Sequence, residues 1–221
     1  MERQVLMDRL SEFLMVEQGG LELYHIAHSR ATNPEVRERY QEFAEQTDRH
    51  RTVLIQLIER LGGDPSYVSP TARLAQLKAA SLLETAIRVG GLSVEELEAN
   101  DLENVLLAET KDHANWHLLE QLFQQMEDPQ VGMAIEEAVR EVEPQEDTHL
   151  EWARTTLSQM SLRMVLQGPA PAPERWQQVF SGPVPPIQQV HSEPMPEDGD
   201  LMETARQFPW QETIAVRQAR R

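Results

Sequence analysis

The chain has 221 residues, enough for one domain with a sizeable core, and its 37 Asp and Glu against 20 Lys and Arg give a formal charge of −17. Such an excess of carboxylates repels phosphate, so nucleic acid and anionic membrane surfaces are not expected as partners. Cysteine is absent, which excludes disulfides, thiolate metal sites and thiol redox chemistry.

Helix-forming residues dominate the composition, only 5% of the residues are aromatic, and no stretch alternates steadily between apolar and polar residues. These features predict an all-α protein. The acidic, amphipathic N-terminus lacks the basic start and the unbroken apolar run of a secretion signal, and no later stretch approaches the roughly 20 apolar residues of a membrane span. We therefore expect a soluble cytoplasmic protein.

The first two helices are expected to form a hairpin. One is predicted over residues 2–29, where apolar residues recur at helical spacing on one face. The second begins after Asn33, with Asn33 or Thr32 as its cap and Pro34 in its first turn, and ends before Gly62 at about residue 61. A connection this short makes the two helices antiparallel neighbours.

A second hairpin is expected after a long connection. That connection, residues 64–92, includes a predicted helix at about 71–89. Ser93, with Glu96 three residues later, is a capping-box start for the next long helix, which is predicted to reach about residue 126, with Asn100-Asp101 as a point of interruption. The last helix is predicted over 130–166, between a tight turn and Gly168.

Two helical hairpins joined by one long crossover form a four-helix bundle with the connectivity of ferritin-like folds. We predict such a bundle over residues 1–166, with an extra helix in the crossover. Nine of the fourteen prolines lie between Pro169 and Pro209, so residues 167–221 are predicted as a Pro-rich tail, flexible or docked, that could recruit a protein partner. Plain disorder of this tail is the alternative interpretation.

Polar residues interrupt the apolar stripe of each long helix near its middle: Glu17, His50, Glu109, and the i, i+3 pair Glu146 and His149. At about 1.5 Å rise per residue, counting from the two tight turns places these groups at nearly the same height. A hydrogen-bonded core residue is the simpler explanation for each of them alone. Three converging buried carboxylates, however, need protons or a cation, and a pair of metal ions is the simplest cation.

Five segments carry a resemblance to a bacterial ferritin-like family whose members are mostly uncharacterised: EQGGLELY (17–24), EFAEQTDRH (42–50), LGGDP (61–65), AETKDHANWHLL (108–119) and EPQEDTHLEWAR (143–154). The likeness covers about residues 5–160 and extends, more distantly, to rubrerythrin-like and manganese-catalase-like bundles. In those bundles, single Glu residues from two helices and E-x-x-H pairs from the other two hold two iron or manganese ions. The resemblance implies these metal ligands: Glu17, His50, Glu109, Glu146 and His149.

One position departs from that pattern, and a proline interrupts the last helix. Thr47 stands three residues before His50, where the pattern has a bridging Glu, and Glu45 would face inward only through a local π-bulge. The site is therefore compatible with one ion, an asymmetric pair or none. Pro144 removes a helix hydrogen bond and is expected to kink the last helix just before Glu146.

Two functions follow from these observations. The first is a di-iron or di-manganese oxidoreductase of the ferroxidase, peroxidase or catalase type, which reacts with dioxygen or peroxide in iron handling or the stress response. The second is a non-catalytic scaffold with a degenerate site and a tail that binds a partner. Pairwise association through bundle faces into a homodimer is compatible with either function.

Overall fold

The computed structural model describes residues 2–88 and 92–168, so the predicted tail from residue 169 onward lies outside the described residues. Five helices make up most of this part: α1 (Arg3–Arg30), α2 (Pro34–Arg60), α3 (Pro70–Arg88), α4 (Val94–Phe123) and α5 (Pro129–Gln167). No strand occurs among the described residues, which confirms the all-α prediction. None of these helices is long and apolar enough to cross a membrane.

The helix ends follow local signals in the sequence. Asn33 Oδ1 accepts a hydrogen bond from the backbone N–H of Glu35 (2.9 Å) at the start of α2. The predicted capping box opens α4: the Glu96 N–H donates to Ser93 Oγ (3.2 Å), and the Ser93 N–H donates to the Glu96 carboxylate (2.7 Å). Gly62 follows α2 with a φ of 73°, which glycine adopts without strain. These caps satisfy backbone groups that a helix leaves unpaired at its ends.

The predicted interruption of α4 does not occur. The helix passes through Asp101, whose side chain points inward and pairs with Arg30 of α1 at 3.1 Å. It ends at Phe123, three residues before the predicted end. The last helix, α5, runs from Pro129 to Gln167 with Pro144 inside it, and the kink expected at Pro144 stays a prediction.

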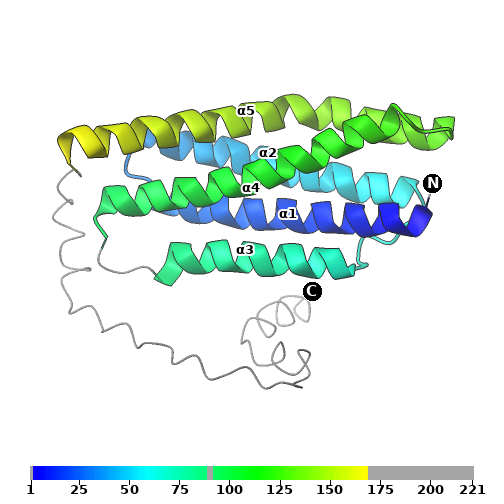
Figure 1. The fold of residues 1–221 in the computed structure, drawn as a ribbon, viewed down its shortest axis with the longest axis horizontal. Coiled ribbons are helices and arrows are strands. Elements are labelled where there is room, and N and C mark those ends of the chain that lie inside the picture. Colours follow the sequence, from blue (N-terminus) through cyan, green and yellow to red (C-terminus); the bar gives the residue numbers. More distant parts are fainter. Residues whose placement is uncertain (1, 89–91, 169–221) are drawn as a thin grey trace, which may run out of the picture. The chain divides into compact units, whose positions relative to one another are not determined.

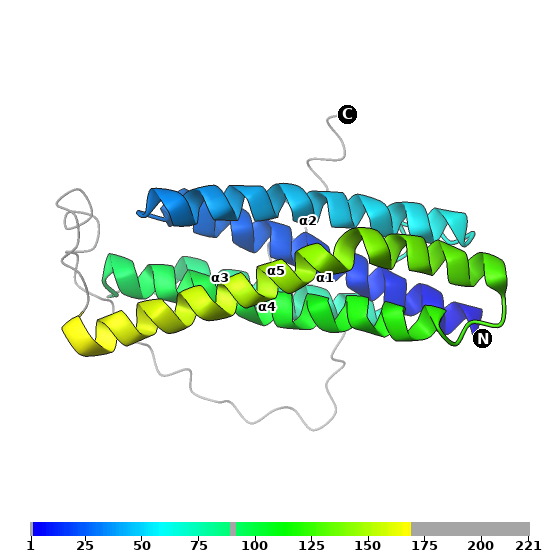
Figure 2. The ribbon, with the colours of Figure 1, turned by 90° about the horizontal axis from the view of Figure 1, so that it is seen from above.

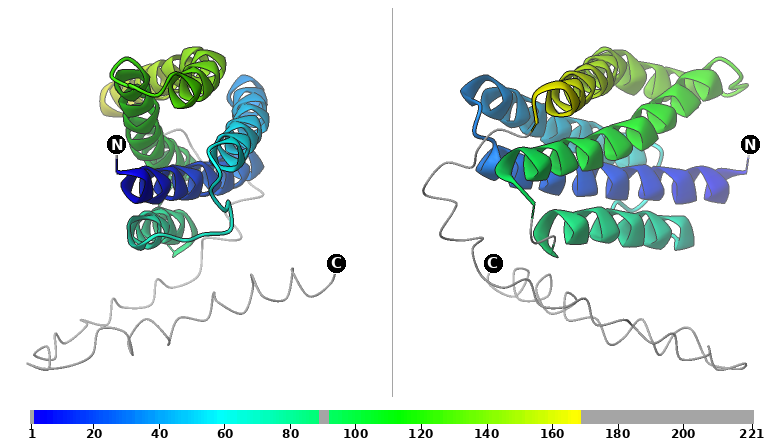
Figure 3. Two further views of the ribbon diagram at one scale, coloured as in Figure 1. Left: turned by 90° about the vertical axis from the view of Figure 1, so that its right-hand side faces the viewer. Right: turned by 60° about the vertical axis from the view of Figure 1, so that its left-hand side comes forward.

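The helices form two antiparallel hairpins, α1 with α2 and α4 with α5, as the colour sequence in Figure 1 shows. Helix α3 carries the chain back along the bundle, so that α4 runs antiparallel to α1 (Figure 1). Figure 2 shows α4 and α5 side by side along the bundle, and the end view in Figure 3 places α3 outside the four long helices, against α1. The described residues are thus a four-helix bundle with one additional helix.

Apolar residues of the bundle form two buried clusters. One contains Leu10, Leu54 and Ile135, and the other contains Leu23, Phe43 and Leu102. Along each long helix, the two clusters are separated by about two turns that carry buried polar side chains. The core is therefore interrupted by one polar layer, at the level that the sequence predicts.

Helix α3 approaches α1 closely at Gly19. A Cβ atom added to Gly19 would lie 2.6 Å from the Cβ of Ala79, whereas one added to the neighbouring Gly20 would meet only Thr47 Cγ2, at 3.9 Å. The absence of a side chain at Gly19 lets α3 pack directly on the α1 backbone.

Candidate metal centre

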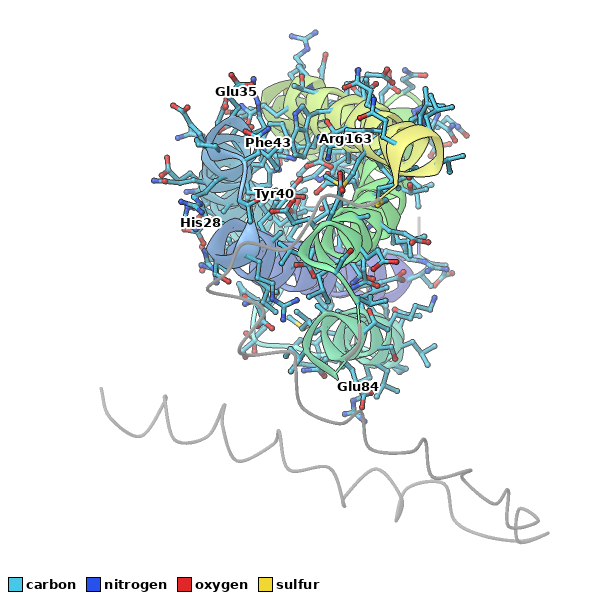
Figure 4. The ribbon with its side chains drawn as sticks, turned by 90° about the vertical axis from the view of Figure 1, so that its left-hand side faces the viewer. His28, Glu35, Tyr40, Phe43, Glu84 and Arg163 are labelled. Carbon is cyan, nitrogen blue, oxygen red and sulfur yellow. The ribbon has the colours of Figure 1, made fainter. Side chains whose placement is uncertain are left out.

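The five residues predicted as ligands all lie in the polar layer between the two apolar clusters. Glu17 comes from α1, His50 from α2, Glu109 from α4, and Glu146 and His149 from α5, and none is more than 3% exposed. In the view along the bundle, neighbouring side chains of α2 such as Phe43 point into the same interior (Figure 4). Four helices thus bring acidic and imidazole groups to one buried level.

Glu146 is shared between two groups of potential ligand atoms. The first group is Glu17, His50 and Glu146, and the second is Glu109, Glu146 and His149; within each, the atoms lie within 4.8 Å of one another. His50 Nδ1 lies 2.8 Å from Glu146 Oε1 and 3.8 Å from Glu17 Oε2. His149 Nδ1 lies 3.5 Å from Glu109 Oε2 and 3.9 Å from Glu146 Oε1. Glu146 is thus common to both groups, each of which could hold a metal ion.

The outer polar atoms of these side chains are held by hydrogen bonds. Trp116 donates its indole N–H to Glu17 Oε1 (2.9 Å), and the Tyr24 hydroxyl donates to Glu109 Oε1 (2.8 Å).

Each imidazole has an amide partner on its outer side. His50 Nε2 lies 2.9 Å from Gln145 Oε1, and His149 Nε2 lies 2.7 Å from Gln46 Oε1. An amide oxygen can only accept, so each Nε2 carries the proton and each Nδ1 is left as a lone pair when the imidazole is neutral. This tautomer is the one that a metal-binding Nδ1 requires.

The inner atoms of the same five residues have no hydrogen-bond partner although they are buried: Glu17 Oε2, His50 Nδ1, Glu109 Oε2, Glu146 Oε2 and His149 Nδ1. Buried polar atoms in folded proteins are normally satisfied, and an unsatisfied one is unfavourable by about 1–3 kcal/mol. All five belong to the two groups around Glu146 and are electron-pair donors. The donor set therefore fits a divalent cation.

Burial and like charge dominate the electrostatics of the centre. Burial raises the pKa of Glu17 well above its usual value, and the charge of Asp112 raises it further. Burial raises the pKa of Glu146 in the same way, again with Asp112 as the next contributor. Burial lowers the pKa of His50 to about 4, so this imidazole is neutral at physiological pH.

No Arg or Lys among the described residues forms an ion pair with Glu17, Glu109 or Glu146. Residues 2–88 and 92–168 therefore supply no permanent positive charge in contact with these carboxylates. They must take up protons or bind cations.

Helix α2 contributes no acidic residue to this layer. Thr47 is buried at the position one turn before His50, while Glu45 is exposed and α2 is a regular α-helix throughout. The π-bulge that would turn Glu45 inward is absent. Glu146 is consequently the single carboxylate shared by the two groups.

Three residues of this layer, Gln46, Asp112 and Gln145, were not predicted from the sequence. Gln46 and Gln145 each precede a residue of the predicted layer and read as ordinary surface amides. Asp112 is 5% exposed and lies one turn after Glu109, a spacing that places it on the same face of α4. The i, i+3 relation to Glu109 was the available signal for Asp112.

A separate acidic and imidazole group lies on the surface between α4 and α5. His117, Glu120 and Glu143 bring ligand-type atoms within 4.8 Å of one another, and the nearby His113 Nε2 lies 2.8 Å from Asp147 Oδ1. These groups are exposed or half-buried, so water compensates their charges. They do not belong to the buried centre.

The described chain is thus an all-helical bundle with a buried carboxylate and histidine cluster that could hold metal. Residues 1–88 match a family model described as Domain of unknown function (DUF892). This segment includes Glu17, Thr47 and His50 and ends before the α4 and α5 residues of the centre. No curated protein and no solved structure matches the chain.

Proposed function

We propose that the bundle, residues 1–166, is a ferritin-like metal protein that holds two iron or manganese ions in the polar layer and reacts with dioxygen or peroxide. Glu17 and His50 would hold one ion, Glu109 and His149 would hold the other, and Glu146 would be available to both. Carboxylate and imidazole donors without thiolates suit iron and manganese. Iron handling and protection from oxidants are the roles that follow from this chemistry.

One observation carries the proposal. The five predicted ligands each present a buried, unpartnered donor atom, and these atoms gather in two overlapping groups. Of the eight buried side-chain atoms without a hydrogen-bond partner among the described residues, these five belong to the two groups. Cation binding satisfies them together.

The chain's own residues act by positioning. Tyr24 and Trp116 fix the two single carboxylates through their outer oxygens, and Gln46 and Gln145 fix the imidazole rings. The apolar clusters on both sides exclude bulk water from the layer. Bound iron or manganese would supply the redox chemistry, which the carboxylate and imidazole side chains do not perform by themselves.

A non-catalytic scaffold is the second candidate, and Thr47 is the observation that favours it. Because Thr47 replaces a second bridging carboxylate, the two groups contain only three Glu side chains. Their three negative charges do not balance the four positive charges of two divalent ions. In this alternative, protonated Glu17 and Glu146 would form a neutral polar layer, and the tail would recruit a partner.

Elemental analysis decides between the two candidates. Protein would be purified after expression with added iron and with added manganese. We expect nearly two ions per wild-type chain and the loss of at least one in Glu146→Gln, which keeps the side-chain size and removes the shared charge. Glu143→Gln, one turn earlier on α5 and part of the surface group, is the matched control and should retain the wild-type content.

A wild-type protein that carries no metal after either expression, and takes up none on titration, would support the scaffold instead. If metal is present, ferrous-oxidation and peroxide-consumption assays test the second half of the proposal. Both activities should fall in Glu146→Gln and persist in Glu143→Gln.

A further inference from the structure

A groove separate from the candidate metal centre lies where α3 packs on the outside of the bundle. Helix α1 forms the floor of this groove, and α3 and α4 form its two walls. Its volume is about 530 Å³, within the range of about 300–1,000 Å³ that is usual for small-molecule sites. The lining is mainly apolar, and the described residues that form it include none of the five donors of the metal centre.

The two walls of the groove meet at one end and diverge toward the other. Near the end of α3, the Asn104 amide of α4 donates to Thr85 Oγ1 at 3.0 Å and joins the two helices. From this contact, α4 rises away from α3 along the bundle (Figure 1). Helices α1 and α3 run in the same direction, since Ser11 bonds to the backbone just before α3 and Gly19 meets Ala79 further along. The open end of the groove therefore lies toward the beginnings of α1 and α3.

Both lysines of the chain line this groove. Lys78 belongs to α3 and Lys111 to α4, and the sequence contains no other lysine. Arg9 of α1 adds a third cation, and Glu12 is the only acidic residue among the described residues of the lining. The chain has a formal charge of −17, so the protein as a whole repels anions. The groove reverses this sign locally.

The positive charges of the groove are only partly neutralised. Glu12 Oε2 lies 2.7 Å from Arg9 Nη1, and Glu12 Oε1 lies 3.0 Å from Lys111 Nζ, so one carboxylate serves two cations. Lys78 is exposed and forms no hydrogen bond or ion pair within residues 2–88 and 92–168. Because a lysine stem packs along apolar surface while its ammonium group stays at the edge, the rim of the groove keeps an excess of positive charge.

Charged and apolar residues occupy different ends of the groove. Arg9 and Lys111 lie toward the open end. Lys78 leans the same way, because helical side chains tilt toward the N-terminus of their helix and α3 begins at that end. Leu23 of α1 and Leu82 of α3 lie toward the closed end. This order of a charged opening and an apolar interior matches a chain molecule with one anionic head group.

We propose that the groove binds a fatty acid, with its carboxylate between Lys78 and Lys111 and its hydrocarbon chain along α1 toward Leu23. The inference goes beyond the proposed function and needs no metal. Burial of the chain supplies the affinity, and the lysines select the anionic head group. A second copy of this protein or an anionic membrane would bring extended negative charge, which the −17 charge of the chain repels.

The first experiment is a calorimetric titration of full-length protein with decanoate, below the concentration of micelle formation and at physiological ionic strength. Decanoate should bind once per chain and about 10-fold more tightly than octanoate, because it buries two more CH₂ groups. Decanol, with the same chain and no charge, should bind about 5–10-fold more weakly than decanoate.

A charge variant tests the position of the head group. Lys78→Glu reverses one charge at the rim and should weaken the binding of decanoate by about 5–10-fold. The matched control is Arg154→Glu, which makes the same change at an exposed residue of α5, a helix that does not line the groove. Its affinity should stay within about twofold of the wild type, because salt screens charges more than about 8 Å apart.

An apolar variant tests the position of the chain. Leu107→Ser removes part of the α4 wall and should weaken decanoate binding by about 3–10-fold. Leu162→Ser on α5 is the matched control and should bind like the wild type, since the two leucines are 51% and 59% exposed. Both changes lie at exposed residues, so the variants should fold, and circular dichroism checks this.

Decanoate that does not bind, or that binds Lys78→Glu and Leu107→Ser as tightly as the wild type, overturns the inference and leaves the proposed function standing. Decanol that binds as tightly as decanoate also overturns it, because the lysines would then select nothing. Co-sedimentation with anionic vesicles and size-exclusion chromatography test the other occupants. Vesicle binding that Lys78→Glu abolishes, or a dimer that Leu107→Ser separates, would place a membrane surface or a second copy in the groove instead.

Discussion

Glu146→Gln should stabilise the metal-free protein and destabilise the metal-loaded one, relative to the wild type. The carboxyl group is 1% exposed, and its pKa is raised by burial and by the neighbouring carboxylates. A raised pKa in the folded state means that stability is fully present below the unfolded pKa and is lost as the pH rises through the folded pKa. At pH 8 and without metal, the wild type therefore carries an unfavourable buried acid that the variant lacks.

The size of the effect follows from the surroundings of Glu146. Replacing a buried ion pair by hydrophobic residues of similar volume is often neutral or stabilising by about 1–4 kcal/mol, and we expect the removal of one uncompensated buried acid to fall in the same range. In a bundle of this size, each kcal/mol corresponds to about 2–4 °C in Tm. Metal at about 1,000 times its Kd adds about 4.1 kcal/mol for each ion that the wild type binds and the variant does not, so at that concentration the order of the two proteins should reverse.

Thermal unfolding followed by circular dichroism, at pH 5 and pH 8, with EDTA and with MnCl₂, measures all of these quantities. In EDTA, the difference in free energy of unfolding between Glu146→Gln and the wild type should shrink at pH 5. Near the pKa of the unfolded chain, keeping the buried carboxyl group protonated costs the folded wild type little. A variant that is several kcal/mol less stable than the wild type in EDTA at pH 8 would show that the carboxylate supports the fold directly. The reasoning about an uncompensated acid would then be wrong.

Two further predictions concern packing and a buried ion pair. In urea denaturation, Gly19→Ala should lower the free energy of unfolding by about 1–3 kcal/mol, because its Cβ would lie 2.6 Å from the Cβ of Ala79. Gly20→Ala is the control: its Cβ would meet only Thr47 Cγ2, at 3.9 Å, so this change should be neutral or stabilising by up to about 1 kcal/mol. Arg30→Met should destabilise by about 1–3 kcal/mol at pH 8 and by less at pH 5. The reason is that burial raises the pKa of Asp101 to about 6, so Asp101 needs its Arg30 partner mainly above that pH; equal losses at both pH values would contradict this assignment.

The arrangement of the helices was predictable because its signals are local. Asn33 with Pro34, the Ser93 capping box and Gly62 each act through the backbone of their own turn, so the sequence alone indicates where α2 and α4 begin and where α2 ends. Short connections then force two antiparallel hairpins. The polar layer was predictable for a related reason, since helical periodicity places Glu17 and Glu146 on core-facing stripes at similar distances from the tight turns.

The partners within that layer depended on the tertiary structure. No local rule of sequence links Gln46 to His149 or Gln145 to His50. These contacts depend on the rotation of each helix about its axis and on the distance between helices, which side-chain packing determines across the whole bundle. The sequence by itself specified which faces turn inward, while the packing of four helices decided which atoms meet there and which are left open to a cation.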